Sequence, residues 1–144
     1  MRAEILAAAL GLALASSAAL AQNTPSAEGA RVYFVNLEDG QHVTSPFLVQ
    51  FGLTGMGVAP FGLTGQNTEH TGHHHLVIDS PPPQAGVPIP AEPGKYVHYG
   101  RGQTEVMLEL PPGEHTLQLV LGDHMHIPHE PAVMSEPITI TVDQ

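Results

Sequence analysis

The sequence contains no cysteine and no tryptophan, and only 4 of its 144 residues are lysine or arginine. Without cysteine there is no disulfide, no thiolate metal ligand, no thiol nucleophile and no lipid anchor attached through cysteine. The 14 aspartate and glutamate residues give a formal net charge of −10. So few basic residues cannot build the positive face with which proteins neutralise nucleic-acid phosphates, and we expect no nucleic-acid partner.

Long hydrophobic runs are also missing, except near the start of the chain. Met1-Arg2 is a short basic start, Ile5–Leu14 is apolar, and Ala19-Leu20-Ala21 fits the small-x-small cleavage rule. This pattern is typical of a secretory signal peptide, here residues 1–21. An uncleaved membrane anchor is the alternative, although the apolar run is short for a span of about 20 residues. We expect a periplasmic or secreted protein with no membrane span after cleavage.

Sustained helical periodicity is absent as well, whereas proline and glycine occur 14 and 15 times. These two residues separate seven short segments with β-rich or alternating patterns, at 31–36, 47–53, 74–79, 95–99, 104–110, 114–122 and 137–142. The pattern predicts an all-β protein, an immunoglobulin-like antiparallel β-sandwich of about seven strands. We expect residues 22–30 to be a flexible N-terminal segment and residues 31–144 to form a single sandwich domain.

Histidine is the residue that the chain has in excess, with ten copies. In an antiparallel sandwich with these strands, eight of them map to loops and strand ends at one pole, at 70, 73, 74, 75, 98, 124, 126 and 129. His42 and His115 map to the opposite pole. We expect His42 to be exposed and His115, after the Pro111-Pro112-Gly113 corner, to be a structural, hydrogen-bonded residue.

Neutral imidazole is a common ligand of copper and zinc, and residues two apart in a strand point to the same face. The candidate metal ligands are His73, His74, His75, His98, His126 and His129, and the additional candidates are His70, His124 and Met125. Imidazole with thioether and no thiolate favours copper, and zinc is the alternative. Because ligating histidines usually donate their second N–H to an acceptor, Gln103, Glu105 and Asp123 are expected to orient them.

Other interpretations of the same residues remain open. The histidines could form a buried imidazole–carboxylate network without metal, and His74 alternates with Leu76, so it could point into the core. The chain could be a non-catalytic envelope interaction module, or a metalloenzyme with Glu105 or Asp123 as base. No HExxH or G-x-S-x-G motif occurs, so we favour a non-enzymatic protein that binds copper and exchanges it with a periplasmic delivery partner.

Three segments of the sequence, TGHHHLVID, VHYGRGQTE and GEHTLQLVLGDHMHIPHEP, resemble one family of small exported bacterial domains that is classed as a domain of unknown function. The resemblance covers residues 31–142. It carries over His73, His74, His75, Asp79, His98, Gln103, Glu105, His115, Asp123, His126 and His129, whereas His124 and Met125 occupy variable positions of the family pattern. The resemblance implies export and supplies no activity, so the function is argued from the residues.

Overall fold

The structure of the protein, a computed structural model, describes residues 23–63 and 68–144. The expected signal peptide, residues 1–21, lies outside this part. The described chain forms nine strands: β1 (Arg31–Phe34), β2 (His42–Thr44), β3 (Phe47–Thr54), β4 (Gly57–Val58), β5 (Thr71–Ile78), β6 (Tyr96–His98), β7 (Glu105–Leu108), β8 (Gly113–Gly122) and β9 (Ile138–Asp143). No described segment is a helix long and apolar enough to cross a membrane.

The strands form two sheets, which confirms the all-β prediction. The smaller sheet has the order β1-β3-β7, and the larger has the order β2-β9-β8-β5-β4 with β6 paired to the other part of β5. All seven predicted strands are present. The predicted strands pair antiparallel with one another. The strands that the sequence did not predict, β2 and β4, pair in parallel with β9 and β5, so the larger sheet is mixed. At three and two residues, they are too short to show an alternating pattern.

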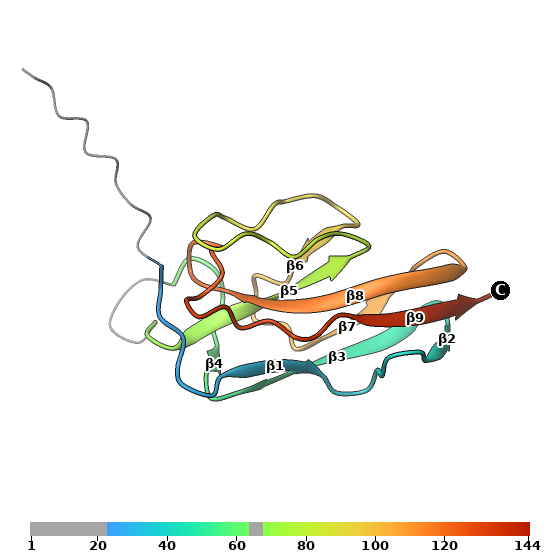
Figure 1. Ribbon diagram of the computed structural model, residues 1–144, viewed down its shortest axis with the longest axis horizontal. Helices are drawn as coiled ribbons and strands as arrows, with labels where there is room; N and C mark the ends of the chain where they lie inside the picture. The colour runs from blue at the N-terminus through green and yellow to red at the C-terminus, as the bar shows by residue number, and fades with distance from the viewer. Residues whose placement is uncertain (1–22, 64–67) are drawn as a thin grey trace, which may run out of the picture.

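The two sheets pack face to face around one hydrophobic core (Figure 1). The smaller sheet contributes Val49 and Phe51 from β3, and the larger sheet contributes Leu76, Leu119 and other side chains that are completely buried. Burial of these apolar side chains is the main favourable contribution to the stability of a domain without disulfides.

β5 is buried on both of its faces, and this places the histidines. Successive side chains of a strand point to opposite faces. Leu76 and Ile78 lie in the core between the sheets, whereas Val77 packs with Ile89 and Val120 in a second cluster on the outer face of the larger sheet. The proline-rich segment 80–94 covers that outer face (Figure 1). His73 and His75 therefore share the outer face with Val77, and His74 points into the core.

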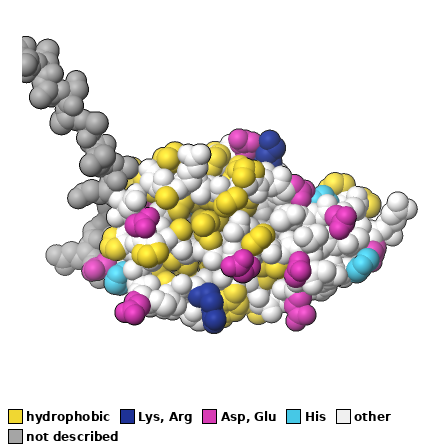
Figure 2. Space-filling model, viewed as in Figure 1, with side chains coloured by type: hydrophobic (Ala, Val, Ile, Leu, Met, Phe, Trp, Pro, Cys, Tyr) yellow, Lys and Arg dark blue, Asp and Glu magenta, His cyan; other side chains and the backbone are white. Residues whose placement is uncertain are grey.

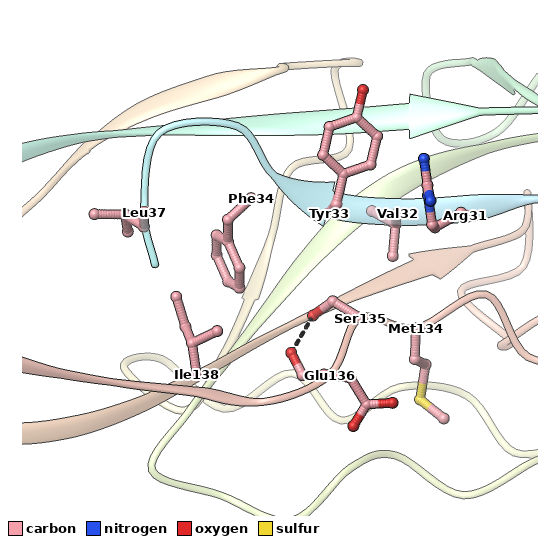
Figure 3. Close-up of a pocket in the computed structure, with 9 residues that line it drawn as sticks. All are labelled: Arg31, Val32, Tyr33, Phe34, Leu37, Met134, Ser135, Glu136 and Ile138. Atoms are coloured by element: carbon pink, nitrogen blue, oxygen red, sulfur yellow. Dashed lines mark hydrogen bonds between the residues drawn. The ribbon is translucent and has the colours of Figure 1, made fainter. Parts of the chain in front are cut away.

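One groove in the surface lies away from the histidines. On the face shown in Figure 2, acidic side chains are scattered around a central area of hydrophobic ones. A groove of about 390 Å³ opens between β1 and the segment before β9 (Figure 3) and is lined by Arg31, Phe34, Met134, Glu136 and other side chains. None of the residues lining it is a histidine, so the groove is separate from the histidine-rich region.

The corner before β8 is held by His115, as the sequence predicted. The ring Nδ1 lies 2.7 Å from Asp79 Oδ2, and Nε2 lies 2.9 Å from the carbonyl oxygen of Pro111. The other Asp79 oxygen accepts a hydrogen bond from the backbone N–H of Thr116 at 2.7 Å. This carboxylate thus joins the end of β5 to the start of β8.

We expect the Asp79 carboxylate to govern the titration of His115. Burial is the largest single influence and lowers the pKa of His115, but the hydrogen bonds to Asp79 and Pro111 and the charge of Asp79 together raise it above its ordinary value of 6.5. Since the folded state binds this proton more tightly, the resulting stabilisation is present below pH 6.5 and is lost as pH rises through the folded pKa. In an NMR titration, Asp79→Asn should lower the His115 pKa, whereas Glu114→Gln, a neighbouring exposed carboxylate, should not; an unchanged pKa in Asp79→Asn would contradict this assignment.

Candidate metal centre

Three histidines from three different elements meet on the outer face of the larger sheet. His73 lies near the start of β5, His98 ends β6, and His126 lies in the loop after β8. Each offers one ring nitrogen, and these three atoms all lie within 4.8 Å of one another. The pairing of His73 with Gly122 and of His75 with His98 explains the convergence, because it brings the ends of β5, β6 and β8 together.

His75 is a fourth imidazole beside the triad of His73, His98 and His126. Its ring centroid lies 4.7 Å from that of His73, 5.0 Å from that of His98 and 5.7 Å from that of His126. Two glycines make room for these rings. A Cβ on Gly100 would lie 2.2 Å from Cε1 of His98, and a Cβ on Gly122 would lie 2.6 Å from Cε1 of His75, so a side chain at either position would displace an imidazole.

Burial and mutual repulsion keep these imidazoles neutral. Burial, with smaller contributions from His98 and His126, lowers the pKa of His73 to about 3. Burial and the neighbouring imidazoles lower the pKa of His75 to about 2. The pKa values of His98 and His126 are also lowered, first by burial. A neutral imidazole carries the free lone pair that a metal ion requires, so the cluster does not have to lose protons near neutral pH.

The nitrogen atoms of the cluster have few partners within the protein. Nε2 of His73, Nδ1 of His75 and Nε2 of His126 are buried, and none has a hydrogen-bond partner among the described residues. By contrast, His115 bonds through both ring nitrogens and His42 lies 2.8 Å from Asp143. Buried polar atoms are normally paired. Both ring nitrogens of His74 are also unpaired, but His74 lies by itself in the core. In the cluster the unpaired nitrogens belong to histidines that converge, and this combination fits a ligand that is not part of the protein.

Phe61 lies over the triad from the loop after β4. Its ring centroid is 4.2 Å from that of His126, 5.9 Å from that of His98 and 6.2 Å from that of His73. Its backbone N–H donates a 2.7 Å hydrogen bond to the carbonyl of Gly100, which ties the loop to the turn after β6. No pattern in the sequence assigned Phe61 to the site.

Two of the six predicted ligands lie apart from the cluster. His74 is fully buried on the opposite face of β5, with its ring centroid 5.2 Å from that of Phe51. His129 is also fully buried, but its Nε2 and Nδ1 lie 3.1 Å and 3.3 Å from the carbonyl oxygens of Thr71 and Leu121. His129 therefore links β5 to β8.

The additional candidates and the orienting residues are placed differently from the expectation. His70 and Met125 are exposed, and His124 is half-buried; none belongs to the group of histidines whose nitrogens converge. Gln103 accepts a hydrogen bond from the backbone of Arg101, and Glu105 accepts one from Gln50. Asp123 bonds to Thr24 and to two backbone N–H groups. Among the described residues, the side chains of these three orienting candidates have no hydrogen bond to a ring nitrogen of the cluster.

The described part of the protein thus contains a cluster of neutral imidazoles from His73, His98 and His126. Neighbouring members of this triad are 25 and 28 positions apart in the sequence. No curated protein and no solved structure matches the chain. One family model does match, over residues 49–143, a range that includes the whole histidine cluster. The chain belongs to the family described as domain of unknown function DUF4399.

Proposed function

We propose that this protein is an exported metal-binding protein that takes up one copper ion at His73, His98 and His126. The observation that carries the proposal is the convergence of three neutral imidazole nitrogens within 4.8 Å. Donors about 2.0–2.1 Å from one ion in a tetrahedral arrangement lie about 3.4 Å apart. Small rotations of the three side chains would shorten the separations between their nitrogens, now up to 4.8 Å, to this value and let all three bind one ion. His75 lies close enough to be the fourth ligand.

The unpaired nitrogens favour metal over a purely structural histidine network. A structural network would satisfy buried ring nitrogens with carboxylates or carbonyls, as His115 and His129 do. At His73 and His126, Nε2 has no such partner in the described chain. Leaving buried polar atoms unpaired is costly, and a bound ion would remove that cost.

The donor set favours copper over zinc. Ligands made only of nitrogen bind Cu²⁺ more tightly than Zn²⁺ in the general order of divalent ion affinities. The thioethers do not strengthen this argument, because Met56 packs against the core and Met134 packs with Val77 and Val120. Zinc remains the alternative ion, since imidazole alone is enough to bind it.

Uptake and transfer fit the placement of the ligands. His73 is buried, whereas His98 is exposed, so one side of the site faces solvent and an ion can enter or leave there. Together with the signal peptide expected at residues 1–21, this supports a role in holding copper in the periplasm and exchanging it with a delivery partner. Of the two carboxylates considered as the base of a metalloenzyme, Glu105 accepts a hydrogen bond from Gln50, and Asp123 is engaged in three hydrogen bonds.

Metal stoichiometry tests the proposal. Protein made without a histidine tag is loaded with excess Cu²⁺ or Zn²⁺, desalted and analysed for elements. We expect about one ion per chain, and a value near zero for His73→Ala and for His98→Ala. His42→Ala is the matched control, because this exposed histidine pairs with Asp143 far from the cluster in the sheet; it should bind as the wild type does. Equal loss in all three variants, or no binding by the wild type, would refute the proposal.

A further inference from the structure

We propose that Thr24 is a positioning residue for the metal centre: its hydroxyl holds the Asp123 carboxylate, and Asp123 holds the turn that presents His126. The inference rests on the proposed metal binding and adds a residue 99 positions away from Asp123 in the sequence. Nothing in the local pattern around Thr24 indicates this role.

Asp123 organises the loop after β8 from inside. Only 1% of its surface is exposed. One carboxylate oxygen accepts hydrogen bonds from the backbone N–H groups of Met125 and Ile127, at 2.8 and 2.9 Å. The other accepts the hydroxyl of Thr24 at 2.6 Å. Within residues 23–63 and 68–144, no basic side chain forms an ion pair with this carboxylate, and its three hydrogen bonds hold the loop.

The turn that Asp123 fixes is the one that carries His126. The backbone N–H of His126 donates to the carbonyl of Asp123 at 3.0 Å, and the N–H of Asp123 donates to the carbonyl of Ile127 at 2.9 Å. His126 has φ of 62°, a left-handed conformation that is unfavourable for a residue with a side chain and persists only where the surroundings impose it. The position of the His126 ring therefore depends on bonds around Asp123.

Thr24 is itself held against the far end of the same loop. Its carbonyl accepts a hydrogen bond from the N–H of Glu130 at 2.9 Å, and the N–H of Ser26 donates to the carbonyl of Glu130 at 3.2 Å. The N-terminal segment thus bonds to position 123 through a side chain and to position 130 through the backbone. These bonds hold both ends of the loop that contains His126.

Loss of the Thr24 hydroxyl should therefore weaken ion binding. A buried carboxylate oxygen would be left without its donor and would turn toward another one. The turn around His126 would then lose its fixed geometry, although every histidine remains. Because pre-organisation of a ligand set lowers the entropic cost of binding, the loss should be seen in the affinity for the ion.

The experiment compares three substitutions at Thr24 with one control substitution at Ser26, all in the full chain. Affinities for Cu²⁺ and Zn²⁺ are measured by competition with a chelator of known affinity, and the thermal midpoint of the metal-free protein is measured alongside. Thr24→Val should raise Kd about tenfold, and Thr24→Ala should do the same. Thr24→Ser, which keeps the hydroxyl, should stay within about twofold. Ser26→Ala is the matched control, because its hydroxyl bonds to the carbonyl of Pro131 and not to Asp123.

The copper spectrum separates positioning from general stabilisation. Electron paramagnetic resonance of the Cu²⁺ form should show altered nitrogen coordination in Thr24→Val and Thr24→Ala and the wild-type spectrum in Thr24→Ser. A lower thermal midpoint with unchanged Kd and unchanged spectrum would mean that Thr24 is only structural and would overturn the inference while leaving the proposed function intact. A wild type that binds no ion would remove both.

Discussion

Replacement of His74 by leucine is expected to stabilise the metal-free protein, and more so in acid. His74 is fully buried, both of its ring nitrogens lack a hydrogen-bond partner in the described chain, and burial lowers its pKa to about 4. The unfolded chain regains the ordinary value of 6.5. Between these two values the unfolded state binds more protons than the folded state, so the stability of the wild type falls as pH falls.

The size of this effect follows from the shift. A difference of one pKa unit corresponds to about 1.4 kcal/mol, so His74 alone removes about 2 kcal/mol of stability between pH 7.5 and pH 5. His73 and His75, whose pKa values are also lowered by burial, act in the same direction. The advantage of His74→Leu over the wild type should therefore grow by about 2 kcal/mol over this range, because leucine binds no proton.

Urea unfolding at pH 7.5, 6 and 5 measures this difference. The control is Leu76→Met, a volume-conserving change on the same buried face of β5, which alters packing but adds no titrating group. Its stability relative to the wild type should be the same at all three pH values. If the free energies of unfolding of His74→Leu and the wild type differed by the same amount at all three pH values, His74 would not be a buried histidine that stays neutral in the folded state.

The sequence predicted those parts of the structure that depend on local patterns. Alternation of Leu117, Leu119 and Leu121 predicted β8, and all three side chains are buried in the core. The spacing of His73 and His75 predicted that both lie on one face of a strand, and their ring centroids are 4.7 Å apart. Both inferences need only the two-residue period of a strand.

Features that depend on contacts between distant segments could not be predicted in this way. The alternation of His74 with Leu76 left open whether His74 points into the core or toward the other histidines, and only its contact with Phe51 decides this. Phe61 enters the site through a hydrogen bond to Gly100, and Thr24 reaches Asp123 across 99 residues. The sequence does not show that Gly100 and Gly122 leave space for imidazole rings, because this follows only from the positions of the His98 and His75 rings.

Bound metal is expected to raise the thermal midpoint by about 10 °C. An ion that binds only the folded state stabilises it by about 2.7 kcal/mol when its free concentration is 100 times Kd. For a domain of about 120 residues, each kcal/mol shifts the midpoint by about 4 °C. Calorimetry of the metal-free protein with and without Cu²⁺ or Zn²⁺ measures the shift, and His98→Ala, which removes an exposed ligand, should abolish it.

A pair of glycine substitutions tests the site while keeping all ten histidines. A Cβ on Gly100 would lie 2.4 Å from Nε2 of His98, whereas a Cβ on Gly57 meets only a methyl group of Thr71 at 3.5 Å. Gly100→Ala should therefore displace His98 and lose most of the metal-induced shift, and Gly57→Ala should keep it. If both variants kept the full shift, the ion would bind at histidines other than the triad. If both lost it, general disturbance of the fold rather than displacement of one ligand would explain the result.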